Sequence, residues 1–112
     1  MKYSVYFISD AEEDIFEIYN YILHRDSAEK ADYVFRKIQE TCNSLEVVAM
    51  RGHIPPELDR ISVHNYLEIH FKPYRIIYQI FTNKVFIHCV LDGRRDLQDL
   101  LQRRLIRSSY KT

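Results

Sequence analysis

The segment that decides the fold is YLEIHFKPYRIIYQIFTNKVFIHCVLDGRRDLQDLL, residues 66–101. It contains three short runs of β-branched and aromatic residues, which are interrupted at Lys72-Pro73 and at Thr82-Asn83. Such runs are typical of strands, and two-residue interruptions are typical of tight hairpin turns. The segment therefore predicts three antiparallel strands, followed by a helix after Gly93.

Two-residue turns also fix which residues face each other across the strands. The expected facing pairs are Leu67 with Tyr78, Ile69 with Ile76, Ile76 with Cys89, and Tyr78 with Ile87. These pairs would make one sheet face apolar. The opposite face would carry a mixed set of side chains: Tyr66, Glu68, His70, Arg75, Ile77, Gln79, Phe86 and His88. On this mixed face we expect His70 beside Arg75 and Ile77 beside His88, and we take it as the candidate working surface.

The residues before this segment predict a strand and two helices. Residues 3–8 alternate as a strand does, and Ser9 with Glu12 has the pattern of a capping box at a helix start. The apolar positions of the first helix are Ile15, Ile18, Tyr19 and Ile22. A second helix, capped by Asp26 or Ser27, has the apolar positions Ala31, Val34, Phe35, Ile38, Cys42 and Leu45. The short connection makes the two helices an antiparallel helical hairpin.

Residues 46–63 are expected to form a loop, because Pro55-Pro56 excludes both a helix and a central strand. Asp96 is expected to cap a last helix, whose apolar positions are Leu97, Leu100, Leu101 and Leu105. Residues 1–112 are thus predicted to form a single α+β domain. It has an N-terminal strand, an antiparallel helical hairpin packed on a mostly antiparallel four-stranded sheet, and a C-terminal helix.

Charge and composition limit the possible functions. The formal net charge is zero, which argues against nucleic acid as the main partner. Residues 93–112 nevertheless hold six basic and two acidic residues, so a local basic patch is possible. Cys42 and Cys89 fall at apolar positions and are predicted to be reduced core thiols. The histidines lack metal-ligand spacing, so the sequence predicts neither a metal nor a cofactor.

The chain shows no signal-peptide pattern, and no apolar run approaches the roughly 20 residues that a membrane span needs. We therefore expect a cytoplasmic protein without a membrane partner.

The run Tyr74-Arg75-Ile76-Ile77-Tyr78-Gln79-Ile80, the valine-rich strand after it, and Asp92-Gly93-Arg94-Arg95-Asp96-Leu97 together resemble the RelE/ParE superfamily of bacterial toxins. The resemblance implies the toxin of a type II toxin–antitoxin system of the plasmid-stabilisation type, which a cognate antitoxin protein neutralises. RelE-like members cut mRNA on the ribosome, whereas ParE-like members poison DNA gyrase. A toxin dimer or a toxin–antitoxin hetero-oligomer is also compatible with the resemblance.

RNA cleavage needs a base, an acid, and cations that stabilise the developing phosphorane charge. By resemblance, Arg75 and Arg95 could hold a phosphate, and the candidate catalytic residues of a nuclease are Arg75, Arg95, His88 and Glu68. Nucleases of this superfamily place a tyrosine or histidine after the last strand or in the following helix. Residues 90–109 contain neither, and the matching helical position is Leu101.

The resemblance is therefore nearer to the ParE branch, and we expect a growth inhibitor that is not an enzyme. The residues expected to bind the target are Arg75, Arg94, Arg95, Arg103 and Arg104. Arg75 could instead pair with Asp92 or Glu68, and the run Arg103, Arg104 and Arg107 could be a solvated helix face or could meet an acidic antitoxin segment. A ribosome-dependent, metal-independent endoribonuclease and an inactive antitoxin-binding relative remain the alternatives.

Overall fold

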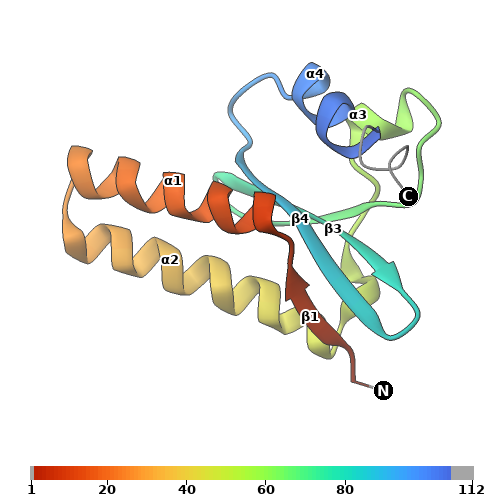
Figure 1. The fold of residues 1–112 in the computed structure, drawn as a ribbon, viewed down its shortest axis with the longest axis horizontal. Coiled ribbons are helices and arrows are strands. Elements are labelled where there is room, and N and C mark those ends of the chain that lie inside the picture. Colours follow the sequence, from red (N-terminus) through yellow and green to blue (C-terminus); the bar gives the residue numbers. More distant parts are fainter. Residues whose placement is uncertain (1, 107–112) are drawn as a thin grey trace.

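Residues 2–106, which the computed structural model describes, form a four-stranded sheet with helices packed on both faces (Figure 1). The elements in chain order are β1 (Ser4–Phe7), α1 (Ser9–Arg25), α2 (Ala28–Asn43), the 3-10 turns η1 (Ser44–Glu46) and η2 (Ala49–Arg51), α3 (Pro56–Asp59), β2 (Leu67–Phe71), β3 (Tyr74–Phe81), β4 (Lys84–Asp92), α4 (Gln98–Leu101) and the π-helical turn η3 (Gln102–Ile106). The predicted α+β class is confirmed.

The strand order in the sheet is β1-β4-β3-β2. β4 pairs antiparallel with β3, and β3 pairs antiparallel with β2, through turns at Lys72-Pro73 and Thr82-Asn83 as predicted. β1 runs parallel to β4 at the edge, where Phe7 faces Ile87. The sheet is therefore mostly antiparallel, and its parallel edge strand leads directly into α1.

The predicted register holds only as far as a bulge in β4. Three predicted facing pairs are observed: Leu67 with Tyr78, Ile69 with Ile76, and Tyr78 with Ile87. Beyond them the prediction is wrong by one residue, because Ile76 faces Val90 and Ile77 faces Cys89. β4 contains one extra residue, His88, opposite the junction of Ile77 and Tyr78. Such a bulge moves the following residues to the other sheet face, so Cys89 belongs to the face opposite the helical hairpin.

The helical hairpin covers one face of the sheet (Figure 1). The Ser27 hydroxyl accepts the Lys30 amide at 3.1 Å. Of the two caps predicted for the second helix, Asp26 or Ser27, the structure thus has Ser27. Val34 and Ile38 are buried at helical spacing against the sheet. Phe35, predicted to be buried, is 42% exposed, because it lies one position off that stripe and packs against the edge of Tyr19.

The capping box predicted at Ser9 is not formed. Ser9 is already the first residue of α1, and Ile8 occupies the capping position without a side-chain hydrogen bond. The Ile8 amide donates to the carbonyl of Ile87 in the sheet, and its carbonyl accepts from the amide of Glu12. The strand thus passes into the helix through backbone hydrogen bonds alone.

Residues 46–63 contain helical turns, so the loop prediction is wrong there. Pro56 is the first residue of α3, a position where a missing amide hydrogen costs nothing. Gly52 lies so close to the sheet that an added Cβ would be 2.6 Å from the Tyr78 hydroxyl and 2.8 Å from the Glu68 carbonyl. The Tyr78 hydroxyl accepts the Gly52 amide at 3.2 Å and donates to the Ala49 carbonyl at 2.6 Å. These contacts hold the segment against the sheet.

The C-terminal helical residues cover the second face of the sheet, together with α3 (Figure 1). Leu97, not the predicted Asp96, occupies the capping position of α4 and makes no side-chain hydrogen bond there, while the Asp96 carboxylate one residue earlier accepts the amide of Gln98. The core on this face consists of Leu58, Tyr66, Ile77, Cys89, Leu91, Leu97, Leu101 and Leu105. The predicted apolar positions of the last helix are therefore confirmed, whereas Arg107 lies outside the described residues. No helix in residues 2–106 is long and apolar enough to cross a membrane.

Both cysteines are free and wholly buried, as predicted, and they lie in different cores. Burial raises the pKa of Cys42 to about 12 and the pKa of Cys89 to about 12. Because the thiolate is the reactive form, we expect neither thiol to react with a disulfide reagent at pH 8 in the folded protein and both to react in denaturant. A spectrophotometric thiol titration checks this, and rapid reaction of either native thiol would contradict it.

Candidate functional site

The mixed sheet face is not an open working surface. α3 and the C-terminal helical residues pack on this face, and the apolar side chains between them and the sheet form the second core. Tyr66 and Ile77 are buried in it. The Tyr66 hydroxyl donates to the Leu105 carbonyl at 3.2 Å. The hypothesis of an exposed face is therefore wrong, because the sequence did not reveal which elements would pack on it.

Arg75 is held between two glutamates at the edge of this face. Its guanidinium donates to Glu68 at 2.7 and 2.8 Å and to Glu57 at 2.6 and 2.7 Å. The side chains of Arg75, Glu57 and Glu68 are only 12%, 13% and 1% exposed. The hydrogen bonds that Arg75 donates to Glu57 are the main reason that the pKa of Arg75 is raised, and Arg75 in turn lowers the pKa of Glu57. Four donated hydrogen bonds leave this guanidinium little capacity to bind a phosphate.

Glu57 was not among the residues singled out from the sequence, although it is the main partner of Arg75. It lies in α3, inside the segment interpreted as a loop. The predicted pairing of Arg75 with Glu68 is observed, and the predicted neighbour His70 does face Arg75 across β2 and β3.

His88 lies away from Arg75 and Glu68. It is three residues along β4 from Leu91, the partner of Arg75, which is a separation of about 10 Å. The imidazole packs against Tyr66 with ring centroids 5.3 Å apart, and its Nε2 lies 3.3 Å from Gln79. Burial lowers the pKa of His88, and the charge of Arg104 acts in the same direction. The structure thus joins Glu68 to Arg75 but leaves His88 in a separate, half-buried packing environment.

Arg104 links the last helical residues to α1. Its guanidinium donates two hydrogen bonds of 2.9 Å to the Asp14 carboxylate and one of 2.9 Å to the His88 carbonyl. Asp14 also accepts the Val90 amide at 3.0 Å. β1 ends opposite Ile87, so these side chains satisfy backbone groups of β4 beyond the end of its edge strand.

Burial raises the pKa of the Asp14 carboxyl, whereas the Val90 amide and Arg104 act in the opposite direction. We treat the carboxyl as ionised, because its oxygens accept three hydrogen bonds and arginine does not lose its proton in proteins.

The arginines after β4 are exposed. Arg94 donates to the Asp92 carboxylate at 2.6 and 3.0 Å, but its side chain is 72% exposed. This hydrogen bonding is the main cause of the lowered pKa of Asp92. Arg95 and Arg103 are exposed as well. Of the five residues expected to bind a target, Arg94, Arg95 and Arg103 present their side chains to solvent, whereas Arg75 and Arg104 lie mostly inside the protein.

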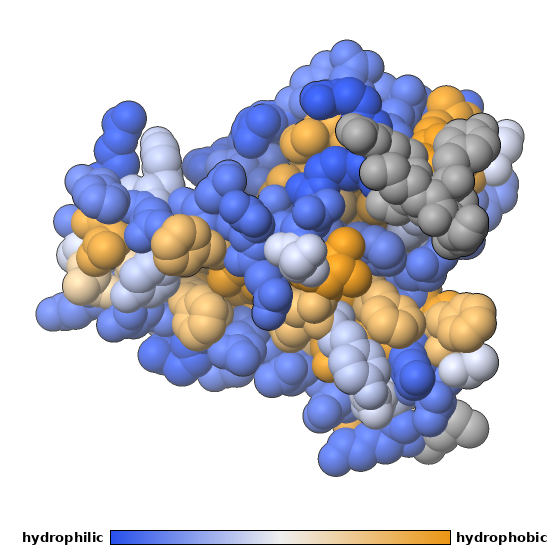
Figure 2. Space-filling model, viewed as in Figure 1, coloured by the Kyte–Doolittle hydropathy of each residue, from blue (hydrophilic) through white to orange (hydrophobic). Residues whose placement is uncertain are grey.

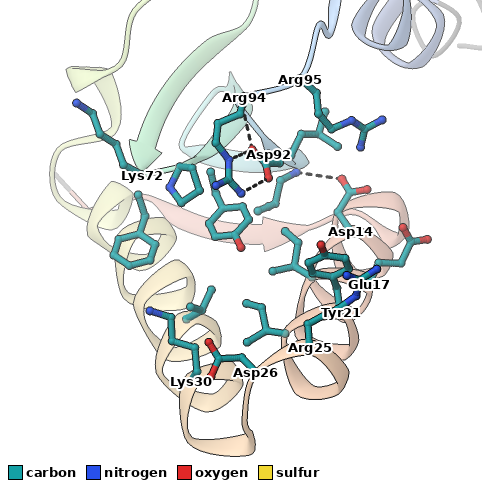
Figure 3. Close-up of a pocket in the computed structure, with 18 of the residues that line it drawn as sticks. Asp14, Glu17, Tyr21, Arg25, Asp26, Lys30, Lys72, Asp92, Arg94 and Arg95 are labelled. Atoms are coloured by element: carbon teal, nitrogen blue, oxygen red, sulfur yellow. Dashed lines mark hydrogen bonds and ion pairs between the residues drawn. The ribbon is translucent and has the colours of Figure 1, made fainter.

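Arg94 and Arg95 stand at the rim of a groove of about 750 Å³ (Figure 3), here called the hairpin groove. α1 and α2 form one wall, and the end of the sheet forms the other. Its apolar floor includes Ile22, Val34 and Val90. The charged residues around it are Asp14, Glu17, Arg25, Asp26, Lys30, Lys72, Asp92, Arg94 and Arg95. Figure 2 shows further apolar surface along the helical hairpin and where it meets the sheet.

Two of the four acidic residues at the groove already have arginine partners, Asp14 with Arg104 and Asp92 with Arg94. The groove therefore has an apolar floor, and the basic side chains around it outnumber the acidic side chains that have no arginine partner among the ion pairs of residues 2–106. This arrangement suits an amphipathic protein segment that carries acidic groups beside its apolar ones.

The family model described as the ParE toxin of the type II toxin–antitoxin system parDE matches residues 5–97. A solved structure titled as the chromosomal ParDE toxin–antitoxin system from P. aeruginosa is similar in fold, with a TM-score of 0.67 at 20% identity over 80% of this chain and 94% of that chain. The toxin–antitoxin complex RelBE2 from Mycobacterium tuberculosis gives a TM-score of 0.60 at 18% identity over 80% of this chain and 96% of that chain. A comparison with curated proteins gives no match.

Proposed function

The chain belongs to the family of ParE toxins of type II toxin–antitoxin systems, and from this premise we propose that it inhibits bacterial growth by poisoning DNA gyrase in the cytoplasm. The observation that carries the proposal is the match of this family model to residues 5–97, which include both walls of the hairpin groove. The proposal includes a cognate antitoxin that neutralises the protein and a role of the pair in plasmid stabilisation.

The placement of the candidate catalytic residues supports gyrase poisoning over mRNA cleavage. A nuclease needs an available cation and an acid or base near one phosphate. Arg75 is bound by two glutamates, and His88 lies about 10 Å further along the sheet. Leu101, at the position that matches the helical tyrosine of nucleases, is fully buried.

We place the antitoxin in the hairpin groove. Its apolar floor would take the apolar side of an antitoxin segment, and Arg94, Arg95 and Lys72 would face acidic groups on that segment. Arg94 and Arg95 also follow the last strand, so the same two side chains would contact gyrase when the antitoxin is absent. Antitoxin and gyrase would then compete for one surface.

Expression of the protein alone under tight control tests the proposal. We expect growth arrest with induction of the DNA-damage response and intact transcripts, and purified protein should increase gyrase-dependent cleavage of supercoiled plasmid. Rapid transcript cleavage without DNA damage would overturn gyrase poisoning in favour of an endoribonuclease. Absence of growth arrest, with folded protein present, would favour an inactive relative that only binds its antitoxin.

The double substitution Arg94→Glu and Arg95→Glu should abolish growth inhibition, because it reverses the charge of two exposed side chains at the groove. The matched control is Arg51→Glu with Lys84→Glu, which makes the same change in charge at exposed positions outside the groove. Circular dichroism verifies folding of both variants. Equal toxicity of the two variants would show that the arginine pair does not contact the target.

A further inference from the structure

The structure points to a divalent transition-metal site formed by His53, Glu68 and His70, and we propose that it binds Zn²⁺. One ligand atom from each of these residues lies within 4.8 Å of the others. No metal site was predicted from the sequence, because the histidines lack metal-ligand spacing along the chain. These three ligands instead come from two chain segments that lie side by side at the sheet edge.

The backbone fixes the positions of the three residues. His53 and Glu68 form an isolated antiparallel bridge, with reciprocal hydrogen bonds of 3.1 and 2.7 Å between their amides and carbonyls. Glu68 and His70 are two residues apart on β2, so their side chains leave the strand on the same face. The bridge brings the side chain of His53 to that face as well.

The distance from each histidine nitrogen to its nearer Glu68 oxygen is close to the ligand spacing of a small tetrahedral site, and one ligand atom from each of the three residues lies within 4.8 Å of the others. The His70 Nε2 lies 3.2 Å from one Glu68 oxygen, and the His53 Nε2 lies 3.4 Å from the other. Zn²⁺ binds histidine nitrogen and carboxylate oxygen at about 2.0–2.2 Å, and tetrahedral geometry then separates two ligand atoms by about 3.4 Å. The imidazole centroids are 5.3 Å apart. Both histidines are substantially exposed, so their rings have room to rotate toward a shared ion.

The charges around Glu68 favour a cation. Arg75 balances only one of the two carboxylates that it contacts, so Glu57, Glu68 and Arg75 together carry one negative charge. Arg75 also holds the Glu68 carboxylate in place through hydrogen bonds of 2.7 and 2.8 Å, as outer-shell partners of metal ligands do. Two histidines and one carboxylate form a ligand set that suits Zn²⁺, and the exposed side would take water as the fourth ligand.

Zn²⁺ bound here would join residues 52–60, which include α3, to β2. The ion would therefore hold α3, which packs over the second core, against the sheet. The site is separate from the hairpin groove. The role that follows is structural, and it does not depend on the target of the toxin.

Calorimetric titration of the untagged, full-length protein with Zn²⁺ at neutral pH tests the site, with thermal unfolding as a second readout. We expect saturable binding of one ion and a higher Tm with Zn²⁺ than with a chelator. His53→Ala and His70→Ala should each lower the affinity by more than the roughly 10–100-fold that loss of an outer-shell partner costs. His64→Ala is the matched control, because this exposed histidine pairs with Asp59 outside the cluster.

Co²⁺ should give the visible absorption of a tetrahedral complex in the wild type and in His64→Ala, and lose it in the other two variants. Histidine substitutions are preferred to substitutions of Glu68, because removal of that buried carboxylate leaves Arg75 with one partner fewer. Absence of Zn²⁺ binding to the wild type would overturn the site and leave only histidine–carboxylate hydrogen bonds. Unchanged binding after loss of either histidine would overturn it equally.

Discussion

Replacement of Arg75 by methionine is expected to destabilise the fold by about 3–5 kcal/mol, the usual effect of removing one partner of a buried ion pair. Methionine fills a similar volume but leaves the carboxylates of Glu57 and Glu68 without their shared cation. Glu68 is 1% exposed, so water cannot replace the lost hydrogen bonds. Urea unfolding followed by circular dichroism measures the change. A loss of this size is a large part of the stability of a small domain.

The matched control is Arg94→Met, which removes the same side chain from an exposed ion pair with Asp92. Exposed pairs contribute about 0–1 kcal/mol, so this variant should unfold close to the wild type. Equal unfolding of the two variants would mean that the contacts of Arg75 with its glutamates contribute little to stability.

The stability difference between Arg75→Met and the wild type should narrow in acid. Arg75 lowers the pKa of Glu57 in the folded protein. The pair therefore stabilises the fold above the ordinary glutamate pKa of about 4.3, and this contribution is lost as the pH falls through the lowered folded pKa. The variant lacks it at every pH. A difference that stays constant from neutral pH into this acidic range would contradict the assignment of Glu57 as an ionised partner.

Features that depend on neighbouring residues could be predicted from the sequence. Ser27 precedes a regular helical pattern and caps it, and the two-residue turns set the facing pairs near them. The extra residue in β4 could not be predicted in this way. Beside this extra residue, Asp14 accepts the backbone amide of Val90 and Arg104 donates to the backbone carbonyl of His88. These two side chains come from opposite ends of the chain.

The candidate site shows the same limit. Arg75 could be predicted as a site residue because its motif is local. Its partner Glu57 lies 18 residues earlier, in a segment that was predicted to be a loop because of its two prolines but contains helical turns. His53 was overlooked for the same reason, since only the bridge to Glu68 brings it to β2. Arg94 and Arg95 were predicted as target-binding residues, and both are exposed in the structure. Binding of a target through them stays a prediction.

Replacement of Asp14 by alanine is the second large effect, and we expect a loss of about 3 kcal/mol, the lower end of the range for breaking a buried ion pair. The lower end applies because the Asp14 and Arg104 side chains are still 13% and 17% exposed. The substitution removes the acceptor of the Val90 amide and the carboxylate that accepts two hydrogen bonds from Arg104. Glu17→Ala is the control, because this exposed carboxylate lies one helical turn further along α1 and a surface substitution changes stability by about 0.5 kcal/mol or less.

Amide hydrogen exchange tells whether the effect arises at the edge of β4. In Asp14→Ala the Val90 amide should exchange faster by more than global destabilisation explains, since its hydrogen-bond acceptor is gone even in the folded state. Exchange of Val90 that accelerates only as much as that of the other core amides would place the loss elsewhere. The substitution also removes the hydrogen bonds from Arg104 to the Asp14 carboxylate of α1, whereas its hydrogen bond to the His88 carbonyl remains. The Asp14 carboxylate thus couples the edge of the sheet, the hairpin and the C-terminal helical residues, three parts that no local sequence pattern connects.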